Sequence, residues 1–182
     1  MRYRTLILPL LLLAFPARAE ETPMAWAFQH FCADESFTLD EARLAIAVAG
    51  GKQHGPTVST RFPMPISITF WDIVIRGQKV GISLGGQRVP AGPGVADMVT
   101  CTVSANGKDD AGIADLRKWA AVAPSMTPAR GIAVYRFQSE GGKHIPVPDA
   151  GNGDGRVWQL DLIGGNFTTV TLMRFFKTRE NS

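Results

Sequence analysis

One segment has the spacing of a hydrolase nucleophile. The residues Gly81-Ile82-Ser83-Leu84-Gly85 match the Gly-x-Ser-x-Gly pattern, and Asp97, Asp109 and His144 follow later, in the chain order that such hydrolases use. That chemistry requires a helix directly after the serine, whereas Gly86-Gln87-Arg88-Val89-Pro90 cannot begin one. We therefore expect Ser83 to be an outward-facing residue of a strand. A small hydrolase that uses Ser83 with His144 is kept as an alternative function.

A second segment resembles part of a calcium-binding loop. Asn152-Gly153-Asp154-Gly155, with Asp161 at the far end, follows the spacing of an EF-hand loop. The first ligand position falls on Ala150 instead of an acid, and residues 157–163 alternate as in a strand. A glycine-rich hairpin loop is the better interpretation.

The histidines show no metal-binding pattern. His30, His54 and His144 have no partner at the spacings typical of zinc sites, and His30 is expected on the polar face of a helix. The glycines near residue 153 are not in a strand-to-helix unit, so they predict no dinucleotide site. We expect no metal or cofactor and assign no catalytic residue.

Three predicted loops are long enough to carry function. They are residues 52–65, 85–97 and 146–155, and loops of this length in a compact domain are often functional. The candidate ligand-facing residues in or beside them are His54, Arg61, Arg88 and His144.

The N-terminus has the pattern of a secretory signal peptide. Arg2 and Arg4 precede the apolar stretch Leu6–Phe15, and Ala17-Arg18-Ala19 supplies small residues at a cleavage site. The prediction is a signal peptide over residues 1–19 and a single globular domain over residues 20–182, with no stable membrane insertion after cleavage. The whole chain carries a formal net charge of +3, with 16 acidic residues. The predicted signal peptide removes three arginines and no acid, which brings the net charge to zero. Nucleic acid is therefore not an expected partner.

The two cysteines predict one disulfide. An even cysteine count in an exported chain indicates pairing. Cys32 continues the apolar face of a helix that begins at Pro23 after a Thr22 cap, and Cys101 lies on the inward face of an alternating strand over residues 98–104. Both sulfur atoms are thus expected to face the core, where a Cys32–Cys101 bond can form.

The remaining pattern predicts an α+β fold. A second helix begins near Thr38 with a capping box, and a third begins at Asp109 or Asp110 and ends at Pro124. About seven short strands, mostly in hairpins, predict a mainly antiparallel sheet with the three helices packed on it. We expect a bulge near Phe70, and a frayed basic tail that includes Arg174.

The chain resembles a group of small exported proteobacterial proteins of uncharacterised function. The resemblance is carried by Phe28-Gln29-His30-Phe31-Cys32, Cys101-Thr102-Val103 and Leu116-Arg117-Lys118-Trp119. It implies a periplasmic, disulfide-bonded protein and no known activity. With no catalytic constellation in the sequence, the leading hypothesis is a non-enzymatic module that binds a protein partner or small ligand through its loops. An envelope assembly or structural factor is the other alternative to the hydrolase.

Overall fold

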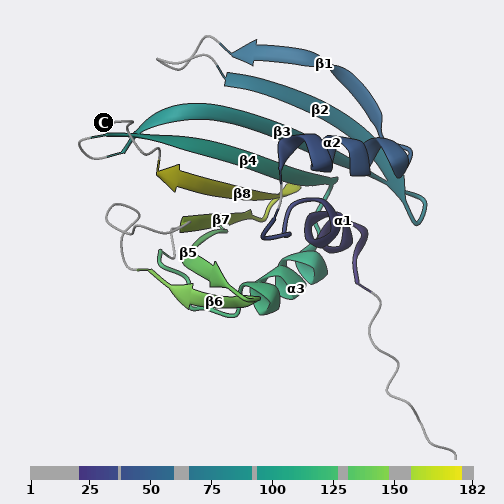
Figure 1. Ribbon diagram of the computed structural model, residues 1–182. Coiled ribbons are helices and arrows are strands. Elements are labelled where there is room, and N and C mark those ends of the chain that lie inside the picture. Colours follow the sequence, from purple (N-terminus) through teal and green to yellow (C-terminus); the bar gives the residue numbers. More distant parts are fainter. Residues whose placement is uncertain are drawn as a thin grey trace, which may run out of the picture.

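The computed structural model describes residues 21–36, 38–59, 66–91, 94–126, 131–147 and 157–177. The predicted signal peptide, Arg61 and the calcium-like segment 152–155 lie outside these ranges. The described residues form three helices and eight strands, in one α+β domain (Figure 1). The helices are α1 Pro23–Phe31, α2 Leu39–Val48 and α3 Asp110–Ala120. The strands are β1 Lys52–Ser59, β2 Ile66–Ile75, β3 Gln78–Ala91, β4 Gly94–Asn106, β5 Ile132–Glu140, β6 Lys143–Pro146, β7 Val157–Ile163 and β8 Phe167–Lys177.

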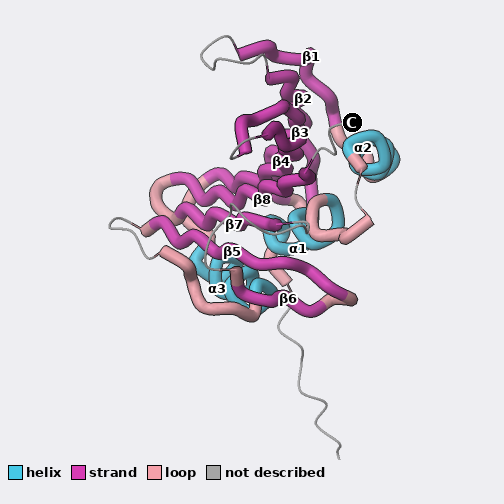
Figure 2. Tube along the Cα trace, turned by 60° about the vertical axis from the view of Figure 1, so that its left-hand side comes forward, coloured by secondary structure: helices cyan, strands magenta, loops and turns pink. Residues whose placement is uncertain are grey.

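The strands form one antiparallel sheet in the order β1-β2-β3-β4-β8-β7-β5-β6, and Figure 2 shows this order from top to bottom. Tight turns between consecutive strands determine much of this order. Arg76-Gly77 joins β2 to β3 and Gly141-Gly142 joins β5 to β6, and all four residues have positive φ angles, as hairpins with two-residue turns require. β1 and β6 are the two edge strands of the sheet.

The helices begin where the sequence predicts. The Thr22 side chain accepts a hydrogen bond from the Ala25 amide, and Thr38 and Glu41 form the reciprocal capping box of α2. Asp109 caps α3. That helix ends before the predicted Pro124, because Ala121 turns into the left-handed conformation at φ +53°.

One face of the sheet carries the core. Leu84, Cys101, Val103, Leu172 and Phe137 belong to a single buried cluster that also contains the apolar residues of all three helices. The helices therefore cover this face of the sheet, which we call the helix-covered face. No helix among the described residues is long and apolar enough to cross a membrane.

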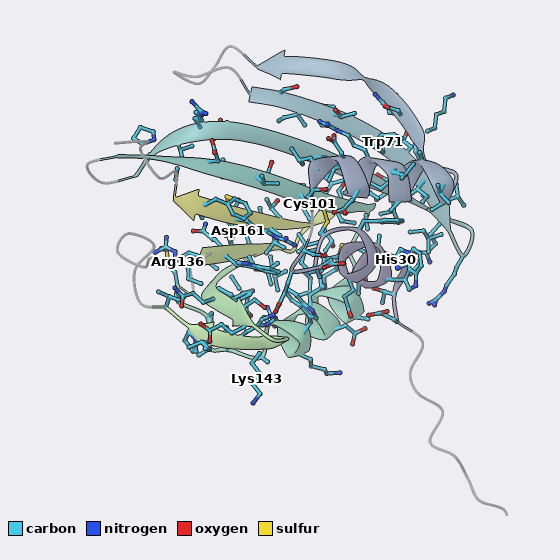
Figure 3. The ribbon with its side chains drawn as sticks, in the orientation of Figure 1. His30, Trp71, Cys101, Arg136, Lys143 and Asp161 are labelled. Atoms are coloured by element: carbon cyan, nitrogen blue, oxygen red, sulfur yellow. A yellow bond between two sulfur atoms is a disulfide. The ribbon has the colours of Figure 1, made fainter. Side chains whose placement is uncertain are left out.

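The predicted disulfide is confirmed. Cys32 and Cys101 are bonded, with their Cα atoms 5.7 Å apart, and both side chains are buried. The bond joins the end of α1 to a central strand, where Figure 3 labels Cys101. A covalent link at this point fixes the first helix to the middle of the sheet.

Arg174 does not belong to a frayed tail. It lies on β8 in phase with Val170 and Leu172, so its side chain enters the core and is only 2% exposed. Its guanidinium lies 4.0 Å from the centroid of the Trp158 ring and donates to the Cys32 carbonyl oxygen. The prediction of a frayed tail was wrong because it was based on the positive charges near the C-terminus. It did not consider which face of the strand Arg174 occupies.

Two of the predicted loops are largely strands. Residues 52–59 of the loop 52–65 form β1, which brings the strand count to eight, and residues 85–97 contain the paired ends of β3 and β4. Loops were predicted because both segments contain several glycine and proline residues and lack an alternating apolar pattern. Backbone hydrogen bonds between strands do not require that pattern, so both segments still form strands. The third loop, 146–155, begins with the last residue of β6, and 148–155 lie outside the described residues.

The predicted bulge near Phe70 is absent from β2. That strand pairs with β3 in unbroken register from Ser67 to Ile75. The irregularity lies opposite, in β1, between His54 and Thr57. The apolar residue Phe70 is outward-facing and 39% exposed, and this is why the apolar phase seemed to shift in the sequence.

Candidate functional site

The second face of the sheet, which we call the helix-free face, has no helix over it among the described residues. Strand register places its residues in rows across the sheet. The middle row runs through His54, Phe70, Ser83, Thr102, Thr171 and Asp161, from the β1 edge to β7. Side chains in such a row are neighbours on one face, so residues from six strands are brought together.

The centre of this face is built from small side chains. On the adjacent strands β3, β4 and β8 the helix-free positions are Gly81, Ser83, Gly85, Thr100, Thr102, Ser104, Thr169 and Thr171. A Cβ atom at Gly81 would lie 2.8 Å from Ser104 Oγ, so any larger residue here would force the Ser104 side chain to move. A solvated sheet face tolerates long charged side chains, but this stretch has none.

The small side chains leave a hollow of about 410 Å³, a volume within the range of small-ligand sites. It is open to solvent and lies over β2, β3, β4 and β8. Its walls on the helix-free face are Phe70, Asp72, Gly81, Ser83, Thr102, Ser104 and Thr169. We call this feature the hollow.

Several hydroxyl groups at and around the hollow have their hydrogen atoms engaged. Ser104 Oγ donates to the Gly81 carbonyl oxygen at 3.4 Å, and Thr102 and Thr171 share a hydrogen bond of 3.0 Å. Beside them, Thr100 Oγ1 donates to the Gly85 carbonyl oxygen at 3.3 Å. A hydroxyl has one hydrogen and two acceptor lone pairs, so these groups present mainly acceptors to the outside.

At the β2 end, the hollow is bounded by the Asp72 carboxylate, which contacts Lys79 and His54. Asp72 Oδ2 lies 2.8 Å from Lys79 Nζ and 2.9 Å from His54 Nε2. Hydrogen bonds from Lys79 and His54 lower the pKa of Asp72, which keeps its carboxylate ionised at neutral pH. Lys52 stands opposite Asp72 in the register of β1 and β2.

A second polar group lies on the same face toward β5. Arg136 Nε donates to Gln159 Oε1 at 3.1 Å, and Gln159 Nε2 donates to Asp161 Oδ1 at 3.1 Å. Burial raises the pKa of Asp161, and the hydrogen bond from Gln159 partly opposes that shift. Figure 3 labels Arg136 and Asp161.

The structure does not bring the predicted ligand-facing residues together. His54 is on edge strand β1 and His144 is on the opposite edge strand, β6. Arg88 is exposed on β3 and pairs with Asp97 at 3.2 Å, and Arg61 lies outside the described residues. Of the three that the structure describes, only His54 approaches the hollow, through its contact with Asp72.

His144 is packed against helix α3 and neighbouring aromatic rings, so its contacts hold the fold together. Its Nδ1 lies 2.9 Å from the Ala120 carbonyl oxygen, and its ring packs 4.2 Å from that of Phe137 and 4.6 Å from that of Trp119. These contacts are on the helix-covered face, whereas Ser83 is on the helix-free face, and four strands separate its strand β3 from β6. The Ser83–His144 pairing of the hydrolase alternative is therefore wrong.

Metal-ligating groups do not gather in the described ranges, where no three His, Cys, Asp or Glu side chains could hold an ion. His30 is exposed, as predicted, and stacks on Trp26 with ring centroids 4.6 Å apart. Asp161, the last residue of the calcium-like pattern, is a strand residue bonded to Gln159.

Sequence reasoning predicted the outward position of Ser83 but missed the hollow. The signal was present, since Thr100, Thr102 and Ser104 alternate with apolar residues, and Thr169 and Thr171 do the same. Hydroxyl residues at those positions fit an ordinary solvated face. Only the strand order shows that three such rows are adjacent.

Comparison with protein-family models, curated proteins and solved structures finds no match to this chain. The function is therefore inferred from the geometry of the helix-free face.

Proposed function

We propose that this protein is an exported, non-enzymatic binding module whose ligand site is the hollow on the helix-free face. The observation that carries the proposal is the run of serine, threonine and glycine across three adjacent central strands. Long side chains are missing there, and the resulting hollow has hydroxyl groups, an aromatic ring and a carboxylate on its walls. The proposal moves the binding site from the predicted loops to the sheet itself.

The proposed location is the periplasm, after removal of residues 1–19. The buried Cys32–Cys101 bond supports an oxidising compartment, since disulfides persist there and are rare in a reducing cytosol. The signal pattern at the N-terminus supports export on independent grounds.

A rigid platform supports binding more than catalysis. The strands under the hollow are central in the sheet, and the disulfide and Arg174 fix the opposite face of the same strands to α1 and to the segment that follows it. The side chains of the hollow are therefore held in place before a ligand arrives, which lowers the entropy lost on binding.

Protein-observed NMR with a chemically diverse library of small compounds tests the proposal. Compounds that bind are expected to shift the amide signals of Ser83, Thr102 and their neighbours on β3, β4 and β8. The variant Ser83→Leu fills the hollow and should remove these shifts, whereas Val74→Ala, on the same face beyond the hollow, should retain them. Shifts confined to the helix-covered face or to the loops would overturn the proposal.

A further inference from the structure

The acceptor-rich floor of the hollow restricts the chemistry of its ligand. The hydrogens of Ser104 and Thr100 are directed to backbone carbonyl oxygens, and one hydroxyl of the Thr102–Thr171 pair donates to the other. Asp72 adds a carboxylate, both of whose contacts with Lys79 and His54 use Oδ2. A complementary ligand brings several hydrogen-bond donors close together, and it can also accept hydrogen bonds from the remaining hydroxyl hydrogens.

Two classes of ligand carry many hydrogen-bond donors, amines and polyols. The charges around the hollow favour the polyols. Asp72 is already neutralised by Lys79, with Lys52 opposite it in register, and Asp161 is linked through Gln159 to Arg136. A cationic amine would meet a carboxylate that is already paired and further cations beside it, which weakens its attraction. An uncharged polyol has no such penalty, and each of its hydroxyls donates one hydrogen bond and accepts others.

The aromatic wall favours a ring-shaped polyol. Phe70 stands beside Ser83 in register and is 39% exposed, so part of its ring is available next to the hydroxyl floor. The C–H bonds on one face of a sugar ring pack against aromatic rings, while the sugar hydroxyls point sideways to polar groups. The hollow offers both kinds of surface side by side.

A peptide fits this surface less well. Extended peptides add to sheets through backbone hydrogen bonds at an edge strand. The hollow lies over β2, β3, β4 and β8, all of which have a neighbouring strand on each side. Their backbone groups are already paired, so the face offers side chains alone.

We propose that the hollow binds a neutral oligosaccharide, with Phe70 packed against a sugar ring and the Ser/Thr floor and Asp72 accepting hydrogen bonds from its hydroxyls. This inference rests on the proposed function and names the ligand class of the same site.

Isothermal titration calorimetry with a panel of tetrasaccharides tests it. The probes are maltotetraose, cellotetraose, mannotetraose and chitotetraose, with tetragalacturonate as an anionic and spermine as a cationic comparator. At least one neutral tetrasaccharide is expected to bind at millimolar concentration or below, and the charged comparators are expected to bind more weakly than it does. Comparators that bind more tightly than every neutral probe would overturn the inference.

Three variants locate the binding. Thr102→Val removes one hydroxyl and should weaken binding about fivefold, and Phe70→Ala should weaken it about tenfold. Val74→Ala, whose residue is 67% exposed on the same strand and face, should bind as the wild type does. Thermal unfolding of each variant establishes that it is folded. Equal affinity of Thr102→Val, Phe70→Ala and the wild type would overturn the inference.

The NMR experiment with the compound library distinguishes a wrong ligand class from a wrong binding site. If non-saccharide compounds shift the amides of the hollow and no tetrasaccharide binds, the ligand class is wrong while the binding site stands. If neither the library nor the saccharides affect the helix-free face, the proposed function fails as well.

Discussion

Removal of the Cys32–Cys101 bond should greatly reduce the stability of the fold. The bond closes a loop with a sequence separation of 69. In the chain-entropy description, a crosslink across such a loop stabilises the folded state by about 4.4 kcal/mol at 25 °C. Domains of this size have a free energy of unfolding of about 5–15 kcal/mol. The double variant Cys32→Ala/Cys101→Ala should therefore be only marginally folded.

Urea unfolding followed by tryptophan fluorescence measures this difference. The double variant should show a lower midpoint and a higher m-value, because the uncrosslinked denatured chain exposes more surface. The matched control is Val103→Ala, which removes buried atoms from the same strand and face as Cys101 without breaking a crosslink. It should lower the midpoint with the m-value unchanged. A loss below about 1 kcal/mol in the double variant, with an unchanged m-value, would refute the reasoning.

Two further predictions concern charged residues. Arg174→Leu should lower the free energy of unfolding by about 2 kcal/mol, because the Cys32 carbonyl loses a buried donor and Trp158 loses its stacked cation. Arg88→Leu, at an exposed ion pair, should lower it by less than about 1 kcal/mol, and equal losses in urea unfolding would contradict this account. Burial raises the pKa of Asp161 above 3.8, so its contribution to stability is present below the unfolded pKa and is lost as the pH rises through the folded pKa. Asp161→Asn should therefore be more stable than the wild type at pH 7 but not at about pH 3, and thermal unfolding that shows the same difference at both values would contradict it.

Local chemistry made much of this fold predictable. The caps at Thr22, Thr38 and Asp109 and the two-residue turns use side chains or glycines close in sequence, so their signals survive in the linear chain. The disulfide was also predictable, since the phase of a helix and of a strand placed both sulfur atoms inward.

The features that sequence reasoning missed depend on long-range pairing. β1 contains Gly55 and Pro56 and shows no alternation, and its strand character comes from its partner β2. Arg174 is buried because β8 pairs centrally and Trp158 on β7 provides a ring for it. The candidate site likewise exists only once β3, β4 and β8 lie side by side, since each strand alone has an unremarkable polar face.

Contacts between ligand and threonine methyl groups test the central claim most directly. In a sample with labelled threonine and leucine methyls and a bound neutral tetrasaccharide, intermolecular NOEs are expected from the sugar to Thr102 and Thr169, which line the hollow. Thr38, the exposed N-cap of α2, provides an internal comparison, for which no NOE is expected. NOEs to Thr102 and Thr169 would support a binding site on the helix-free face. A bound saccharide whose NOEs lead instead to Thr38 and to the exposed Leu44 on α2 would contradict it.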